Sequence, residues 1–204
     1  DEPGLVGVPI ADAPAPLGVH GGRPGAPHPQ NLWGALGGVQ AKWFPQRVDH
    51  FSRDATPATF DQKYFVDASH YDGSGPVLLY ISGEAPLYSA PGMGSFTGSL
   101  ASRLKALVVA VEHRFYGDSQ PFEDVSTDSL RFLSTSQALL DLHNFRVEYD
   151  RTIDPPKGGK PRAWVAMGGS YAGSLAAWFR ARFPHLVAAA HASSAPIEPI
   201  DNYT

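Results

Sequence analysis

The chain has 204 residues, of which 43% are hydrophobic and 18% are charged, a composition typical of a folded globular protein. A net charge of −4 and the lack of any Lys/Arg-rich run argue against nucleic-acid binding. No apolar stretch reaches the roughly 18 to 20 residues that span a bilayer. The chain has no cysteine, so disulfides and thiol catalysis are excluded within it, and its histidines lack metal-ligand spacing. We therefore expect neither a metal nor another cofactor.

The N-terminal segment differs from the rest of the chain. Residues 1–42 are rich in Pro, Gly and Ala and have no hydrophobic period, which predicts a flexible tail or pro-segment. Residues 43–204 are expected to form the N-terminal part of one domain, incomplete at its C-terminus. Within them, residues 44–51 and 59–67 alternate imperfectly between bulky and polar side chains, which predicts a hairpin of two edge strands.

Continuous apolar runs predict the centre of a sheet. Residues 76–82 (PVLLYIS) and 106–112 (ALVVAVE) are rich in Val, Leu and Ile, as parallel strands covered on both faces are. A helix is expected to begin at Ser134, because Gln137 stands three residues later, as in a capping box. Apolar residues then recur at helical spacing as far as Tyr149.

The last third of the chain continues the alternation of strands and helices. Residues 162–167 (RAWVAM) predict a fifth strand, residues 171–183 a helix that stops before Pro184, and residues 186–194 a sixth strand. Such alternation is typical of an α/β fold with a mostly parallel sheet and flanking helices.

A serine stands between the fifth strand and its helix, in the sequence Gly168-Gly169-Ser170-Tyr171-Ala172. An α/β-hydrolase holds its nucleophile on such a turn, in the pattern G-x-S-x-G, with small neighbours that let the backbone fold tightly. This chain departs from the pattern by one methyl group, at Ala172. Ser170 is thus a candidate nucleophile, and the Tyr171 backbone N–H at the helix start is a candidate oxyanion donor. Alternatively, the motif only connects a strand to a helix, since short Ser/Gly motifs recur by chance.

The loop after residues 76–82 offers further candidates. Gly83 stands where an α/β-hydrolase places its second oxyanion donor, and we expect it to need a conformation or close approach that a side chain would spoil. The alternative is an ordinary turn glycine. Glu84 is a candidate substrate-facing carboxylate, although a structural acid or a helix-start anion would also explain it.

The histidines do not complete a triad in the usual order of Ser, then Asp or Glu, then His. Only His185 and His191 follow Ser170, and the acids Glu198 and Asp201 come after them. We expect His185 to lie at the surface or the helix end, and His191 to be a packed strand histidine.

His113 follows the fourth predicted strand, at the edge of the sheet where such sites lie. It is expected to support the site indirectly rather than to act as the base. Its neighbours Glu112, Arg114 and Asp118 are expected to form a polar network that orders the loop.

Four blocks of sequence carry a resemblance: FDQKYFVD, VEHRFYGDSQP, GGSYAGSLAAWFRARFPHL and ASSAP, in this order. From residue 44 onward, the chain resembles the family of prolyl carboxypeptidase, dipeptidyl peptidase II and thymus-specific serine protease. The resemblance implies a secreted, lysosomal or vesicular serine peptidase of the α/β-hydrolase fold that acts on peptides, near proline in the best-known members. It also implies that Ser170 is the nucleophile and that Tyr171 and the Gly83 region form the oxyanion hole.

Three functions are weighed. The first is a serine peptidase whose catalytic acid and histidine lie outside this chain. The isolated chain would then be catalytically silent, and it could form a homodimer or associate with its missing C-terminal portion. The second is a catalytically inactive hydrolase-fold binding protein. The third is an esterase or lipase, against which the lack of an HGGG-type loop counts. A sequon at Asn202 is a weak candidate for glycosylation and agrees with secretion.

Overall fold

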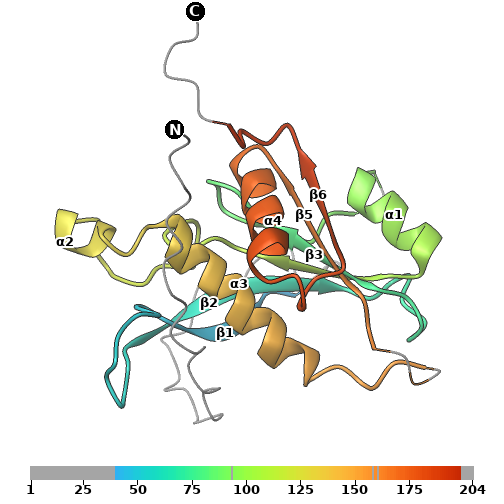
Figure 1. Cartoon of the computed structure of the whole chain (residues 1–204), viewed down its shortest axis with the longest axis horizontal. Helices are drawn as coiled ribbons and strands as arrows, with labels where there is room; N and C mark the ends of the chain where they lie inside the picture. Colours follow the sequence, from blue (N-terminus) through green and yellow to red (C-terminus); the bar gives the residue numbers. More distant parts are fainter. Residues whose placement is uncertain (1–39, 93, 158, 160, 199–204) are drawn as a thin grey trace, which may run out of the picture.

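The computed structural model describes residues 40–92, 94–157, 159 and 161–198. The proposed tail at 1–42 lies almost wholly outside the described residues, and so does Asn202. The described part contains one sheet with the strand order β1-β2-β4-β3-β5-β6 (Figure 1). The strands are β1 (Lys42–Arg47), β2 (Thr59–Asp67), β3 (Val77–Ile81), β4 (Leu107–Val111), β5 (Trp164–Gly169) and β6 (Ala189–Ser193).

The sheet is mixed. β1 and β2 pair antiparallel, which confirms the predicted hairpin, and β2 also pairs antiparallel with β4. The pairs β4–β3, β3–β5 and β5–β6 are all parallel, as predicted. The prediction that both hairpin strands are edge strands is wrong for β2, which lies between β1 and β4. Its imperfect alternation has a physical reason: Tyr64 and Val66 pack on one face of the sheet, while Phe65 is buried on the other.

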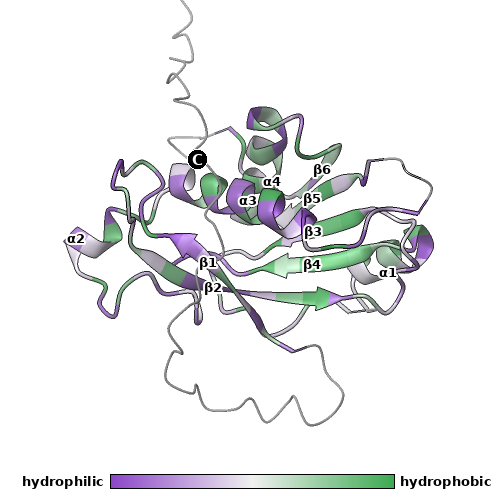
Figure 2. Cartoon of the chain, turned by 90° about the horizontal axis from the view of Figure 1, so that it is seen from below, coloured by the Kyte–Doolittle hydropathy of each residue, from purple (hydrophilic) through white to green (hydrophobic). Residues whose placement is uncertain are grey.

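Helices cover the central strands on both faces. Val77 and Leu79 of β3 face a core that includes Phe145 of α3 (Thr135–Asp150) and Leu175 of α4 (Tyr171–Arg182). The intervening Leu78 faces a second core, which Ala101 of α1 (Phe96–Leu104) closes. Figure 1 shows α3 and α4 together in front of the sheet, and Figure 2 shows the green, hydrophobic β3 and β4 at its centre. The central position predicted for the two apolar runs is confirmed.

The helix predicted from Ser134 is α3, and its start shows half of a capping box. The Ser134 hydroxyl accepts a hydrogen bond from the Gln137 backbone N–H at 3.3 Å. The Gln137 side chain, however, donates to the Asp49 carboxylate at 2.6 Å and accepts from the His50 backbone N–H at 2.9 Å. Gln137 therefore fastens the start of α3 to the turn after β1.

Two helices escaped the sequence prediction. α1 is short, with the apolar Phe96, Leu100 and Leu104 at helical spacing among small polar residues, and α2 (Thr127–Leu130) is a single turn. The signal for α1 lay in its cap, because the Ser95 hydroxyl accepts from the Gly98 backbone N–H at 3.0 Å. None of the described helices is both long and apolar enough to cross a membrane.

β6 lies at the open end of the sheet in the described part of the chain. The prediction that His191 is a packed strand residue is therefore wrong: it is exposed, and its ring stacks on the exposed ring of Phe96 at a centroid distance of 4.8 Å. His185 is exposed in the turn after α4, as predicted.

Candidate active site

The candidate residues gather at the carboxyl edge of the parallel strands. Gly83 follows β3, His113 follows β4, and Ser170 follows β5 directly. Because these strands are neighbours and run in the same direction, their carboxyl ends meet at one edge, where open α/β sheets bind ligands.

Ser170 has a backbone conformation that L-residues rarely adopt. Its φ is 54° and its ψ is −132°, and α4 begins at the next residue. The backbone is held on both sides: Ser170 N–H donates to the Ser193 carbonyl at 2.9 Å, and the Ser170 carbonyl accepts from Ser174 N–H at 3.1 Å. Such a conformation costs on the order of 1–3 kcal/mol, and it persists only where the surrounding structure enforces it. The strain leaves the Ser170 side chain exposed at the edge of the sheet.

The glycines around Ser170 differ in how much room they leave for a side chain. A Cβ atom at Gly168 would lie 2.2 Å from the Ala172 carbonyl oxygen, and one at Gly173 would lie 3.0 Å from the Ser193 carbonyl oxygen. At Gly169 the nearest atom, the Ser193 carbonyl oxygen, would be 3.9 Å away. The tight turn thus requires glycine at 168 but leaves room at 169. It also accommodates the methyl group of Ala172, which is buried.

This difference defines a matched pair of variants. We expect Gly168→Ala to lower the free energy of unfolding by about 3 kcal/mol or more, because backbone atoms would have to move. Gly169→Ala is the control and should change it by less than about 1 kcal/mol. Urea unfolding of the two variants provides the measurement, and equal transition midpoints would contradict the proposed crowding at Gly168.

Two backbone positions were predicted as oxyanion donors. Tyr171 is the first residue of α4, so its N–H has no acceptor within the helix and lies at the positive end of the helix dipole. Gly83 lies against the same turn, because a Cβ atom built on it would meet the Ala172 Cβ at 3.9 Å. Its φ is not in the left-handed region, and this distance is an ordinary contact. The described residues thus leave room for a methyl group at position 83, and the expectation that a side chain there would impair the site stays a prediction.

Glu84 is exposed beside Gly83, which disfavours the alternative of a buried structural acid. Its charge acts on two neighbouring residues of the site. Burial is the largest influence on both: it lowers the pKa of His113 and raises the pKa of Tyr171. The Glu84 carboxylate acts in addition, raising the pKa of each group.

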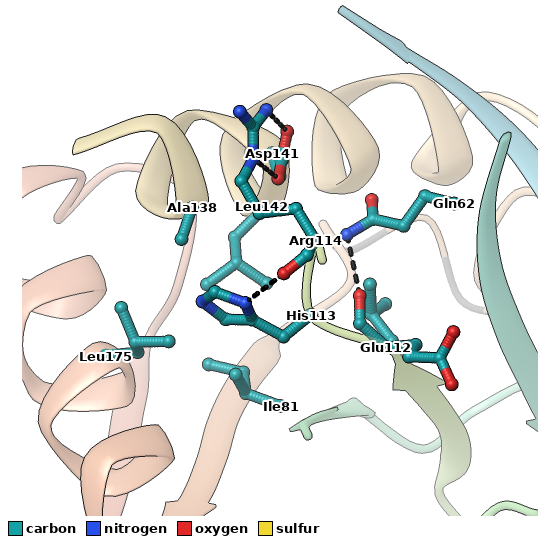
Figure 3. A pocket seen from close by; sticks show the side chains of 10 residues that line it. Gln62, Ile81, Glu112, His113, Arg114, Ala138, Asp141, Leu142 and Leu175 are labelled. Atoms are coloured by element: carbon teal, nitrogen blue, oxygen red, sulfur yellow. Dashed lines mark hydrogen bonds and ion pairs between the residues drawn. The ribbon is translucent and has the colours of Figure 1, made fainter. Parts of the chain in front are cut away.

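His113 is buried behind the Ser170 turn. Its ring borders a small cavity whose lining combines apolar side chains, such as Ile81 and Leu175, with charged ones, such as Asp141 (Figure 3). The ring Nδ1 lies 2.7 Å from the Arg114 carbonyl oxygen, and Nε2 lies 3.2 Å from the Tyr171 hydroxyl. Both ring nitrogens are thus engaged, and within the described residues no histidine is hydrogen-bonded to the Ser170 hydroxyl.

The predicted polar network is confirmed for Glu112 and Asp118 but is wrong for Arg114, which binds elsewhere. The network centres on Glu112, whose side chain is fully buried. One carboxylate oxygen accepts from Leu87 N–H at 2.8 Å and from Lys63 Nζ at 2.9 Å. The other accepts from Asp118 N–H at 3.0 Å and from the Ser119 hydroxyl at 2.7 Å. Glu112 therefore joins the loop after β3, which carries Gly83, to the loop after β4.

Arg114 belongs to a second buried cluster, and its partners escaped the sequence prediction. Its guanidinium makes two 2.7 Å hydrogen bonds to the Asp141 carboxylate and donates to the Val48 and Phe132 carbonyls at 3.0 Å. His50 Nε2 lies 2.7 Å from the same carboxylate. The only signal in the sequence was a carboxylate on the buried face of α3. Within the described ranges, no group of His, Asp and Glu residues is arranged to hold a metal ion.

In this chain a strained serine lies between a parallel strand and a helix, at the carboxyl edge of a sheet with helices on both faces. This arrangement defines the α/β-hydrolase fold. The family described as "Serine carboxypeptidase S28" matches residues 46–203, and the chain belongs to this family.

Named relatives agree with this assignment. The chain is 42% identical to the lysosomal Pro-X carboxypeptidase of Mus musculus over 163 residues (78% of this chain, 32% of the relative). It is 38% identical to the thymus-specific serine protease of Homo sapiens over 172 residues (84% and 33%). Among solved structures, the uncomplexed acylaminoacyl peptidase of Pyrococcus horikoshii aligns with a TM-score of 0.49 at 14% identity, covering 81% of this chain and 25% of that one. The chain spans about a third of the length of these curated relatives.

Proposed function

We propose that the complete protein is a serine-type peptidase that cleaves peptide bonds through an acyl-enzyme formed on Ser170. The strained and exposed Ser170, placed directly before the N-terminus of α4, is the observation that carries this proposal. Membership of the S28 family supports it. The names of the Pro-X carboxypeptidase relatives support exopeptidase action near proline.

In the proposed reaction the Ser170 hydroxyl oxygen attacks the carbonyl carbon of the scissile bond, and a histidine takes the hydroxyl proton. The Tyr171 N–H and a second donor in the Gly83 region stabilise the oxyanion that forms. The tetrahedral species then collapses, the leaving amine takes the proton, and water hydrolyses the ester on Ser170.

We assign the acid and the histidine of the triad to residues outside this chain. Two observations support this assignment. His113 has both ring nitrogens engaged elsewhere, and His185 is exposed in the turn at the far end of α4. The exposed residues of β6 support association with further protein, either the rest of the peptidase domain or a second copy.

The exposed Glu84, next to the Gly83 donor, is proposed to face the peptide substrate. Secretion or delivery to a lysosomal or vesicular compartment is part of the proposal. The names of the lysosomal relatives support the compartment, and glycosylation at Asn202 would accompany it.

A serine-directed fluorophosphonate tests this function on the complete protein. We expect stoichiometric labelling, with the adduct mapped to Ser170 by mass spectrometry, and turnover of peptides that contain proline near the scissile bond. Absence of labelling would favour the inactive binding protein. Labelling with turnover of small esters but of no peptide in a proline-scanning panel would favour an esterase.

A further inference from the structure

The start of α4 is held by a hydrogen bond that no part of the reaction uses, between the His113 ring and the Tyr171 phenol. We propose that His113 is a positioning residue for the oxyanion hole, which acts by holding the Tyr171 side chain and thereby the Tyr171 backbone N–H. The inference rests on the proposed function of Ser170.

The geometry gives His113 a fixed orientation. Its Nδ1 lies 2.7 Å from the carbonyl oxygen of Arg114, and its Nε2 lies 3.2 Å from the Tyr171 phenol oxygen. The two rings pack edge to face at a centroid distance of 5.6 Å, and the Tyr116 ring packs on His113 at 5.4 Å. A contact between residues 58 positions apart thus joins the end of β4 to the first residue of α4.

The direction of the hydrogen bond follows from its partners. A carbonyl oxygen only accepts, so Nδ1 carries the proton and the neutral ring leaves Nε2 as an acceptor. The Tyr171 hydroxyl therefore donates to His113. Burial lowers the pKa of His113 and raises the pKa of Tyr171, so both groups favour the neutral forms that this bond requires.

A second neighbour also acts on the phenol. Burial raises the pKa of the Tyr171 phenol, and the side chain of Thr135, the first residue of α3, lowers it as a hydrogen-bond donor does. With its proton given to His113, the phenol oxygen accepts from the Thr135 hydroxyl. The Tyr171 side chain thus attaches the start of α4 to the end of β4 and to the start of α3.

The nucleophile itself explains why such an attachment is needed. Ser170 occupies the N-cap position of α4, where a serine hydroxyl usually accepts a hydrogen bond from the first turn. Its side chain makes no such capping bond, and a nucleophile has to keep its hydroxyl available for the base and the substrate. An oxyanion donor has to be held within about 0.5 Å of its productive position. The Tyr171 side chain therefore fixes the helix start in place of the missing cap.

Three variants of the complete protein test this role. His113→Phe keeps the ring volume but removes the acceptor, His113→Gln restores an acceptor through its amide oxygen, and Tyr171→Phe removes the donor. We expect His113→Phe and Tyr171→Phe each to lower kcat by about 3- to 10-fold with KM nearly unchanged. The double variant should be no slower than either single one, and His113→Gln should recover most of the loss.

The rate of Ser170 labelling by the fluorophosphonate should follow the same pattern, because phosphonylation also places an oxygen in the oxyanion hole. Provided that the wild type is labelled at Ser170, three results would each overturn the inference. They are additive losses of kcat in the double variant, a change in KM instead of kcat, and a lower unfolding temperature with full kcat. A wild-type protein that is not labelled at Ser170 would overturn the proposed function, and the inference with it.

Discussion

Ser170→Ala is expected to lower kcat of the complete enzyme by about 10⁴-fold or more, because the change removes the hydroxyl on which the proposed acyl-enzyme forms. The φ of 54° is set by the backbone bonds of the turn, not by the hydroxyl, so the fold should be retained. Steady-state turnover of a peptide substrate, together with circular dichroism, measures both effects. An alanine variant that keeps wild-type turnover would remove Ser170 from the chemistry.

Ser170→Gly is the companion to that experiment. Glycine adopts positive φ without steric cost, so this variant should be equally inactive but more stable than Ser170→Ala, by about 1 kcal/mol. The comparison uses unfolding free energies from urea titrations. A glycine variant that is less stable than the alanine variant would show that the turn is not strained.

Asp141→Ala is expected to lower the free energy of unfolding by about 3–5 kcal/mol, the largest stability effect predicted here. The change would leave the Arg114 guanidinium, which is 0% exposed, without its countercharge. Glu148→Ala is the control on the same helix, because Glu148 pairs with a largely exposed Arg151 and should contribute less than about 1 kcal/mol. Equal unfolding midpoints for the two variants would contradict the energetic role of the buried pair.

The same carboxylate predicts a dependence on pH. Burial alone would raise the pKa of Asp141, but the Arg114 guanidinium and His50 hold it below its usual range. The stabilisation by the ionised Asp141 carboxylate is thus complete above the ordinary aspartate pKa of about 4. It is lost as the pH falls through the lowered pKa that Asp141 has in the folded protein. The difference in unfolding free energy between wild type and Asp141→Ala should narrow below about pH 4. A constant difference down to pH 2 would contradict this coupling.

Local patterns predicted much of the fold. The apolar runs at 76–82 and 106–112 identified β3 and β4, because a strand covered on both faces has to be apolar at every position. The position of β2 was not predictable in the same way. It depends on pairing with β4, about 45 residues later in the chain, and alternation within β2 does not encode that partner.

The candidate site, too, was predictable only where its residues are close together in the sequence. The turn at Ser170 is encoded by adjacent residues, so the sequence revealed it. The cluster of Arg114, Asp141 and His50 joins residues 27 and 91 positions apart, and no local pattern relates them. The contact of His113 with Tyr171 escaped for the same reason, although the edge of the sheet on which His113 lies was predicted.

The side chains at the end of β4 also bind to main-chain groups of the loops around them. Glu112 accepts from the Leu87 N–H, and Arg114 donates to the carbonyls of Val48 and Phe132. Every amino acid carries a carbonyl, and all but proline carry an N–H. The anchored loops are therefore free to exchange their side chains over evolution while their backbones keep their position relative to the Ser170 turn. One catalytic frame is thus compatible with many substrate-contacting surfaces, and peptidases that diverge in specificity can do so without rebuilding it.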